Sequence, residues 1–224
     1  ENQALVNALS KSVEAQPNVE LITAGIDRVL AGPNQSMLML DNDDVLSCRL
    51  LVGADGANSF VRKQAGLPIT FKDYEHTAIV ANIKTVEPHS NVARQAFTPT
   101  GPLALLPMSE PNVCSIVWSQ TPEQANLLMA LDDAAFCNAL TAASNSVLGT
   151  ISLETKRAAF PLTMRYARQW AKDGVMLVGD AAHTIHPLAG QGANLGMQDA
   201  LALAETLNSL KASGKDIGLY KHLR

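Results

Sequence analysis

The segment VMLVGDAAH, residues 175–183, decides the fold of this chain. Its four apolar residues predict a buried strand, and the Gly179-Asp180 pair after them places a carboxylate at the carboxyl end of that strand. Open α/β sheets bind their ligands at the carboxyl ends of the strands. We therefore expect an α/β fold with a ligand site beside Asp180.

A glycine-containing loop and a helix continue this segment. Residues 187–196 read PLAGQGANLG, and the leucines that follow predict an amphipathic helix. Gly190 and Gly192 have no Cβ, so the backbone can lie close to a flat ligand. The helix N-terminus offers free N–H groups and the positive end of the helix dipole. Together with Asp180, these features predict a site for a flat, partly anionic ligand that carries hydroxyl groups.

Residues 175–196, here called the Gly-Asp segment, resemble the Gly-Asp motif of the class A flavoprotein monooxygenases. In its long form this segment is similar to the ubiquinone-biosynthesis hydroxylase branch, and within it to the 2-octaprenylphenol hydroxylases. Residues 51–62 (LVGADGANSFVR), the Asp-Gly segment, resemble a second motif of the same family. The resemblance implies that the following residues contact the cofactor: Asp55, Gly56, Arg62, Asp180, Pro187, Gly190, Gln191, Gly192, Ala193 and Asn194.

The resemblance also implies the chemistry of the intact enzyme. FAD would be the cofactor and NAD(P)H the co-substrate, and one oxygen of O₂ would enter the ring of a polyprenylated phenol. Other ubiquinone-biosynthesis proteins are the implied partners. The family relies on its cofactor for the reaction, so no catalytic side chain is assigned.

The family begins with a Gly-x-Gly-x-x-Gly turn that holds the ADP half of FAD, and no such pattern occurs in these 224 residues. We therefore expect a truncated FAD-dependent aromatic hydroxylase fold of mixed α/β and α+β character, which is inactive alone and binds FAD weakly. The expected domains are a first part of the FAD domain at 1–67, a substrate domain at 68–163 and a second FAD part at 164–224. The apolar run GPLALLP at 101–107 implies a substrate pocket with Leu103 and Leu105.

Simpler interpretations of these residues stay open. Asp180 could cap the following helix, and the loop glycines could be ordinary turn residues. Asp180, His183 and His186 have metal-ligand spacing, but the absence of a further ligand motif argues against a metal site. Arg62 is either a solvated helix charge or a neighbour of the cofactor, and the 101–107 run could be a plain buried strand.

Other functions of the whole chain also remain possible. One is a different flavoprotein of the same fold, such as a prenyl-lipid reductase or a soluble-phenol hydroxylase. The other is a remnant or assembly module without catalytic activity.

Composition narrows the class of protein. With 47% hydrophobic residues the chain can bury a core, and its net charge of −4 and pI near 5.7 argue against nucleic-acid binding. The three cysteines are far apart in the sequence, which is typical of a reducing compartment. We expect a cytoplasmic protein, with membrane contact limited to the periphery of the inner membrane.

The local patterns predict the order of elements. Leu5, Leu9 and Val13 predict a helix over residues 3–15. Strands are expected at residues 19–22, 26–30, 37–40, 45–52, 77–83, 93–97, 103–106, 113–118 and 151–160. Helix starts are expected at Ser59 or Asn58, at Thr121 and at Asp132.

Overall fold

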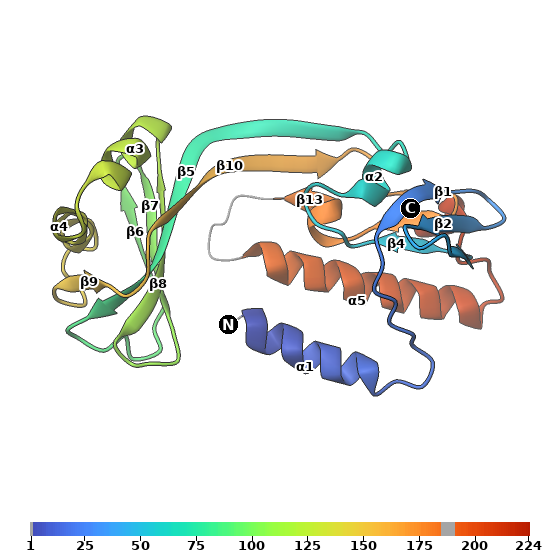
Figure 1. Ribbon diagram of the computed structural model, residues 1–224, viewed down its shortest axis with the longest axis horizontal. Coiled ribbons are helices and arrows are strands. Elements are labelled where there is room, and N and C mark those ends of the chain that lie inside the picture. Colours follow the sequence, from blue (N-terminus) through green and yellow to red (C-terminus); the bar gives the residue numbers. More distant parts are fainter. Residues whose placement is uncertain (1, 185–190) are drawn as a thin grey trace. The chain divides into compact units, whose positions relative to one another are not determined.

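The structure is a computed structural model that describes residues 2–184 and 191–224. It divides the chain into two compact units, Glu1–Lys72 with Met164–Arg224, and Asp73–Thr163. The chain enters the second unit within strand β5 (Ile69–Thr85) and returns within β10 (Ala158–Ala167), as Figure 1 shows. The two units thus meet at residues 72 and 163, and the assignment of one to the cofactor and the other to the substrate stays a prediction.

The first unit is built on two small sheets. One is antiparallel with the order β1-β2-β3, and the other has the order β11-β12-β4. In the second sheet β12 and β4 are parallel, with Val175 opposite Leu51 and Leu177 opposite Gly53. The strands of these two sheets are β1 (Ile26–Leu30), β2 (Ser36–Leu40), β3 (Val45–Cys48), β4 (Leu51–Gly53), β11 (Ala171–Lys172) and β12 (Val175–Leu177). The short strand β13 (His183–Thr184) pairs instead with the end of β10, antiparallel. The helices are α1 (Asn2–Glu14), α2 (Phe60–Gln64), α5 (Gln191–Ala212), α6 (Tyr220–Leu223) and the 3₁₀ turn η1 (Gly179–Ala181).

The second unit is an antiparallel sheet with two helices on one face. Its strands follow the order β10-β5-β8-β7-β6, and β9 pairs with β5. The remaining elements are β6 (Arg94–Thr98), β7 (Gly101–Pro107), β8 (Val113–Gln120), α3 (Pro122–Ala130), α4 (Asp133–Ala143) and β9 (Ile151–Leu153). Thr121 Oγ1 accepts from Gln124 N at 3.3 Å and Asp132 Oδ1 accepts from Ala135 N at 2.7 Å, which confirms both helix starts.

Each unit has its own core. In the second unit one face of the sheet packs on the helices, so Ile79, Leu103 and Ile116 lie in one cluster with Phe136 and Leu140. In the first unit the core forms around the strand β12 and the helix α2, with these buried residues: Val61, Ala65, Leu67, Ala167, Val175, Leu177, Ala181 and Ala182. The apolar run at 175–178 is therefore a buried strand, as its composition predicts.

Three expected strands differ from the structure. Residues 19–22 form no strand among the described residues, because no neighbouring segment pairs with them and Val19, Leu21 and Ile22 are exposed. The run 45–52 is two strands in different sheets: β3 pairs with β2, and β4 pairs with β12. The run 151–160 is also two strands, β9 and the start of β10. An apolar pattern predicts extended chain but does not identify the partner strand.

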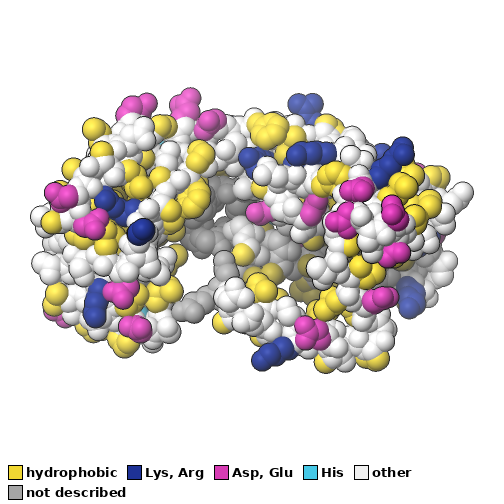
Figure 2. Space-filling view, in the orientation of Figure 1, with side chains coloured by type: hydrophobic (Ala, Val, Ile, Leu, Met, Phe, Trp, Pro, Cys, Tyr) yellow, Lys and Arg dark blue, Asp and Glu magenta, His cyan; other side chains and the backbone are white. Residues whose placement is uncertain are grey.

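Helix α1 forms as predicted, but its apolar side is exposed. Leu5, Val6 and Leu9 are 45%, 54% and 53% exposed, and Figure 2 shows hydrophobic side chains at the surface over this helix. The four-residue spacing thus predicts the helix correctly, while the described residues do not cover its apolar side. None of the described helices has both the length and the apolar character needed to cross a membrane.

The close packing of β4 against β12 and α2 gives a test of the fold. A Cβ on Gly53 would lie 2.9 Å from Leu177 Cδ2 and 2.9 Å from Val61 Cγ1. We predict that Gly53→Val lowers the free energy of unfolding of the full-length protein by about 1–3 kcal/mol, as overpacking does. Urea denaturation measures this change. Gly192→Ala is the control, because no described atom lies within 4 Å of a Cβ added there. Equal stability of Gly53→Val and the wild type would contradict this packing.

Candidate functional site at the ends of two parallel strands

The two sequence segments come together because β4 and β12 are parallel neighbours. β4 leads into the Asp-Gly segment and β12 leads into Gly179 and Asp180. Val178 N donates to Gly53 O at 3.0 Å, which extends the pairing by one residue beyond β12. Since parallel strands end at the same edge of a sheet, the Asp55-Gly56 turn and the Gly179-Asp180 turn share one edge.

Asp55 is held by its own chain. Its Oδ1 accepts from Ser59 Oγ at 2.6 Å, and its Oδ2 accepts from Phe60 N at 2.6 Å and Val61 N at 3.0 Å. Ser59 in turn caps α2 by accepting from Arg62 N at 2.9 Å, so the expected helix start at Ser59 is confirmed. The carboxylate therefore satisfies the first N–H groups of α2 and fixes the turn at Gly56, whose φ is +78°.

These contacts alter the acidity of Asp55. Partial burial raises the pKa of its carboxyl group, but the hydrogen bonds from Ser59, Val61 and Phe60 outweigh it, and the pKa lies below the ordinary value. Because the folded pKa is lower than the unfolded one, this contribution to stability is complete at neutral pH. It is lost as the pH falls through the folded pKa.

Arg62 links the Asp-Gly segment to the Gly-Asp segment. Its side chain is buried, with Nη1 donating to Ala181 O at 2.7 Å and Nη2 donating to Ala57 O at 2.9 Å. Burial lowers the pKa of its guanidinium, while the nearby Asp55 raises it and Arg165 lowers it. Of the two interpretations of Arg62, the structure excludes the solvated helix charge. Its donors bind backbone carbonyls on both turns.

Asp180 lies in η1 directly after β12 and is exposed. Its carboxylate makes no hydrogen bond to the residues that the structure describes, so it does not cap a helix within them. Gly179, before it, has a φ of +59°, a conformation that glycine adopts without strain. Within the described residues, the carboxylate at this sheet edge is therefore unbound.

Helix α5 contributes its first residues to the same segment. A Cβ on Gly192 would meet no atom of a described residue within 4 Å, and Ala193 and Asn194 are exposed. A Cβ on Gly196 would lie 3.2 Å from the Cα of Gly179, so the absence of side chains lets α5 lie directly on η1. Gln191 is the first residue of α5. The predicted site residues Pro187 and Gly190, and His186 of the metal alternative, lie outside the described residues.

Sequence reasoning missed one polar contact in this region. Asp199 on α5 accepts from Gly179 N at 2.9 Å, and the same oxygen, Oδ2, lies 2.7 Å from His183 Nε2. His183 is therefore engaged with a carboxylate. The signal was available, because Asp199 follows Gly196 by three residues and so lies on the same side of the helix.

Leu103 and Leu105, expected in a substrate pocket, are 0% and 2% exposed and belong to the core between the sheet and the helices α3 and α4. Side chains alternate along a strand, so Ala104 and Leu106 lie on the other face of the sheet and are half-buried. For these two leucines the structure supports the alternative of a plain buried strand. Leu105 also lines a cavity of about 500 Å³, together with Arg94, Ala96 and Ser144.

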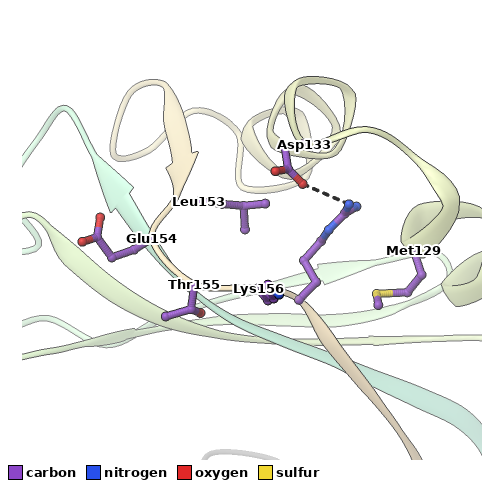
Figure 3. A pocket seen from close by; sticks show the side chains of 7 residues that line it. Met129, Asp133, Leu153, Glu154, Thr155 and Lys156 are labelled. Carbon is purple, nitrogen blue, oxygen red and sulfur yellow. Dashed lines mark hydrogen bonds and ion pairs between the residues drawn. The ribbon is translucent and has the colours of Figure 1, made fainter.

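Another cavity of the second unit, about 440 Å³ in volume, is shown in Figure 3. It lies beside α4 and β9, and the dashed line marks the ion pair of Asp133 with Arg157, at 3.1 Å. Arg157 also donates to Leu128 O at 3.1 Å and Leu131 O at 2.8 Å, at the end of α3. Arg157 therefore binds the last carbonyl groups of α3. None of the predicted site residues lines this cavity.

The fold agrees with the comparisons. The model of the FAD binding domain family matches residues 28–220, so the chain belongs to that family of flavin-binding proteins. Among its relatives is the mitochondrial ubiquinone biosynthesis monooxygenase COQ6 of Drosophila melanogaster, which is 35% identical over all of this chain and 54% of the relative. The 3-demethoxyubiquinol 3-hydroxylase of Escherichia coli is 36% identical over all of this chain and 57% of that enzyme. The chain thus spans about half the length of these relatives.

Solved structures support the fold. The crystal structure of pqsL from Pseudomonas aeruginosa, a probable FAD-dependent monooxygenase, has a TM-score of 0.81 at 23% identity. The match covers 97% of this chain and 63% of pqsL. A flavin-dependent halogenase, CmlS, has a TM-score of 0.68 at 17% identity, with coverage of 84% and 36%. The fold is therefore that of FAD-dependent monooxygenases, as the two motifs predict.

The residues present fit part of a flavin site. The Asp180 carboxylate has no partner among the described residues and can accept from hydroxyl groups, and the space at Gly192 leaves the backbone accessible. Asp55 and Arg62 fit a supporting role better than direct contact, because the atoms described above are already bound within the chain.

The Arg62 link provides a test of how the two turns are held together. We predict that Arg62→Met lowers the free energy of unfolding of the full-length protein by about 1–3 kcal/mol, because two carbonyls lose their donors. Thermal and urea unfolding measure this loss. The control is Lys63→Met on the exposed side of α2, which should change little. If both variants were as stable as the wild type, Arg62 would not hold the two turns.

Proposed function

We propose that the full-length protein is an FAD-dependent hydroxylase of ubiquinone biosynthesis that acts on a polyprenylated phenol. In the balanced reaction, the phenol, O₂, NAD(P)H and one proton give the hydroxylated phenol, NAD(P)⁺ and water. The observation that carries the proposal is the parallel pairing of β4 and β12, which brings both motif turns to one sheet edge in a chain of the FAD binding domain family. The names of the relatives supply the substrate class. The ring position, and thus the 2-octaprenylphenol assignment, stays a prediction.

Each part of the site has a distinct role in this proposal. Bound flavin, reduced by NAD(P)H, supplies the chemistry by which O₂ is activated and one of its oxygens is transferred. The carboxylate of Asp180 accepts hydrogen bonds from hydroxyl groups of the cofactor, and Gly192 lets the backbone of α5 approach it. Asp55 and Arg62 hold the turns that carry these groups.

The substrate side of the proposal rests on the second unit. The sheet face opposite α3 and α4 carries half-buried apolar residues, of which Ala104 and Val80 are both paired with Val117. Leu106 lies on the same face and is paired with the polar Ser115, so the apolar surface is bounded by polar side chains. We assign the apolar substrate surface to this face in place of Leu103 and Leu105. Burial of a hydrocarbon tail is worth about 0.8 kcal/mol per CH₂, so even a partial apolar surface would bind it well.

A polyprenyl tail also bears on location. A chain without a spanning helix among its described residues can still reach such a substrate by peripheral contact with a membrane that holds the tail. We propose peripheral contact of this kind for the full-length protein.

Asp180 gives the first test of the proposed cofactor site. We predict that Asp180→Ala in the full-length protein weakens FAD binding by about tenfold to a hundredfold, since a hydrogen bond to a charged group is worth about 1.5–3 kcal/mol. Flavin fluorescence titration measures the Kd. Because the side chain is exposed, the free energy of unfolding of the apoprotein should not change. Asp27→Ala, an exposed carboxylate on β1, is the control; an unchanged Kd in Asp180→Ala would exclude Asp180 from the flavin site.

The substrate face gives the second test. With ¹⁸O₂, NADPH and a polyprenylphenol, the full-length wild type should add one ¹⁸O atom to the phenol ring, measured by mass spectrometry. We predict that Leu106→Asp reduces this incorporation at least about tenfold while FAD stays bound, because a charge on the apolar face opposes the substrate. Leu105→Asp should instead destabilise the protein, because it places a charge in the core.

Two comparisons complete that experiment. Leu127→Asp, on the exposed side of α3, should leave both the fold and hydroxylation unchanged. The same assay with a phenol that lacks the prenyl tail separates a prenyl-phenol hydroxylase from a soluble-phenol hydroxylase. No ¹⁸O incorporation by the wild type would refute the proposed function, and full activity of Leu106→Asp would place the substrate elsewhere.

A further inference from the structure

A polar contact joins helix α5 to the Gly179-Asp180 turn. One oxygen of Asp199, Oδ2, accepts from Gly179 N at 2.9 Å and lies 2.7 Å from His183 Nε2. Both side chains of the pair are largely buried, at 17% exposure for Asp199 and 8% for His183. The His183 ring also stacks on Trp170, with centroids 4.9 Å apart and planes 29° apart. One carboxylate thus joins the residues on both sides of Asp180 to α5.

Asp199 and His183 lie where they can fix the conformation of the Gly179-Asp180 turn. Gly179 adopts a φ of +59°, and a Cβ on it would lie 3.6 Å from Gly196 Cα. Gly196 and Asp199 are three residues apart, so they present the same side of α5 to the turn. Ala182 N donates to Gly179 O at 2.9 Å, which closes the turn from the other end. Both polar backbone groups of Gly179 are therefore bound, and one of them depends on Asp199.

This arrangement matters because Asp180 has no support of its own. Its carboxylate makes no hydrogen bond to a described residue, so its direction depends on the backbone of the turn. His183 is not free to act on a substrate through Nε2, because that atom faces Asp199. Trp170 and Asp199 hold the ring from its face and from its edge, so the orientation of the imidazole is fixed.

We propose that Asp199 and His183 are positioning residues of the flavin site, which hold the Gly179-Asp180 turn in the conformation that presents Asp180 to the cofactor. The inference rests on the proposed function, in which Asp180 binds FAD. The affinity for flavin then depends on the Asp199 carboxylate, which binds the backbone of the turn from α5.

Four variants of the full-length protein test this inference. Asp199→Ala removes the acceptor, and Asp199→Asn keeps its shape without the charge. His183→Leu removes the donor, and His183→Gln keeps an N–H group near the position of Nε2. The Kd for FAD, the visible spectrum of bound flavin and the urea unfolding of the apoprotein are measured for each.

We expect Asp199→Ala to weaken FAD binding about tenfold or more and to shift the flavin spectrum, since the loss of a charged acceptor is of this size. Asp199→Asn should lie between Asp199→Ala and the wild type. His183→Gln should bind FAD more tightly than His183→Leu. A merely structural role would produce no such rescue, and would not change the flavin spectrum.

The matched control is Asp216→Ala, which removes the ion pair of Asp216 with Arg49 in the same unit. Asp216 accepts from Arg49 Nε at 2.6 Å and Arg49 Nη2 at 2.5 Å, and neither residue belongs to the motif segments. This variant should lose stability but keep the FAD affinity and spectrum of the wild type. Equal weakening of FAD binding by Asp216→Ala and Asp199→Ala would overturn the positioning role.

The outcomes separate the inference from the proposed function. If the wild type binds FAD and Asp199→Ala binds it with the same Kd and spectrum, the inference is wrong and the proposed function stands. If the wild-type full-length protein binds no FAD at all, the proposed function and the inference are both wrong.

Discussion

The parallel pairing of β4 with β12 is the interaction on which the rest of the site depends. Each strand has only three residues, yet they come from positions 51–53 and 175–177, on opposite sides of the second unit in the sequence. Such a short ladder is weak alone, so its neighbours must support it. Leu177 and Val175 are fully buried beside Val61, and Arg62 binds the backbone on both turns. The site thus exists only when both parts of the first unit are folded together.

Close packing around β4 and β12 also explains the small residues in both motif segments. Gly53 faces Leu177 and Val61, and Gly196 faces Gly179, so a Cβ added at Gly53 or Gly196 would crowd the neighbouring element. At Gly192 the neighbourhood is open, so packing within the described residues does not require a glycine there. A ligand that needs the backbone close to it is one reason for a glycine at that position.

The second unit serves the proposed chemistry in a different way. Its sheet has one face committed to the helices and another on which half-buried apolar residues such as Val80, Val117 and Leu106 lie beside the polar Asn82 and Ser115. The core face gives the unit its stability, and the other face is the one where a hydrocarbon can gain by burial. This division separates the residues whose replacement affects folding from those whose replacement affects the substrate.

Much of the fold could be predicted from the sequence, because local signals are strong here. The apolar run before Gly179, the caps at Thr121 and Asp132 and the period of α1 each depend on near neighbours. The structure corrected what depends on distant partners. The split of residues 45–52 between two sheets, the absence of a strand at 19–22 and the burial of Leu105 follow from pairing and packing that a local pattern does not contain.

The candidate site, too, could be predicted only in part from the sequence. Asp180 and Gly192 were predicted from the strand end, from the missing Cβ and from motif resemblance, and no described residue blocks either one. The spacing of Gly196 and Asp199 places both on one side of α5, but it does not identify their partner, because Gly179 lies 20 residues from Asp199. Arg62 likewise binds Ala181 O, which is 119 residues away.

The most direct measurement is the structure of the full-length protein with FAD bound. The flavin is expected at the carboxyl ends of β4 and β12, with a cofactor hydroxyl within about 3.2 Å of the Asp180 carboxylate. The Asp199 carboxylate should still bind Gly179 N and His183 in that complex. Flavin bound at another edge of the sheet, with Asp180 in solvent, would contradict the proposal that this pair of strands builds the cofactor site.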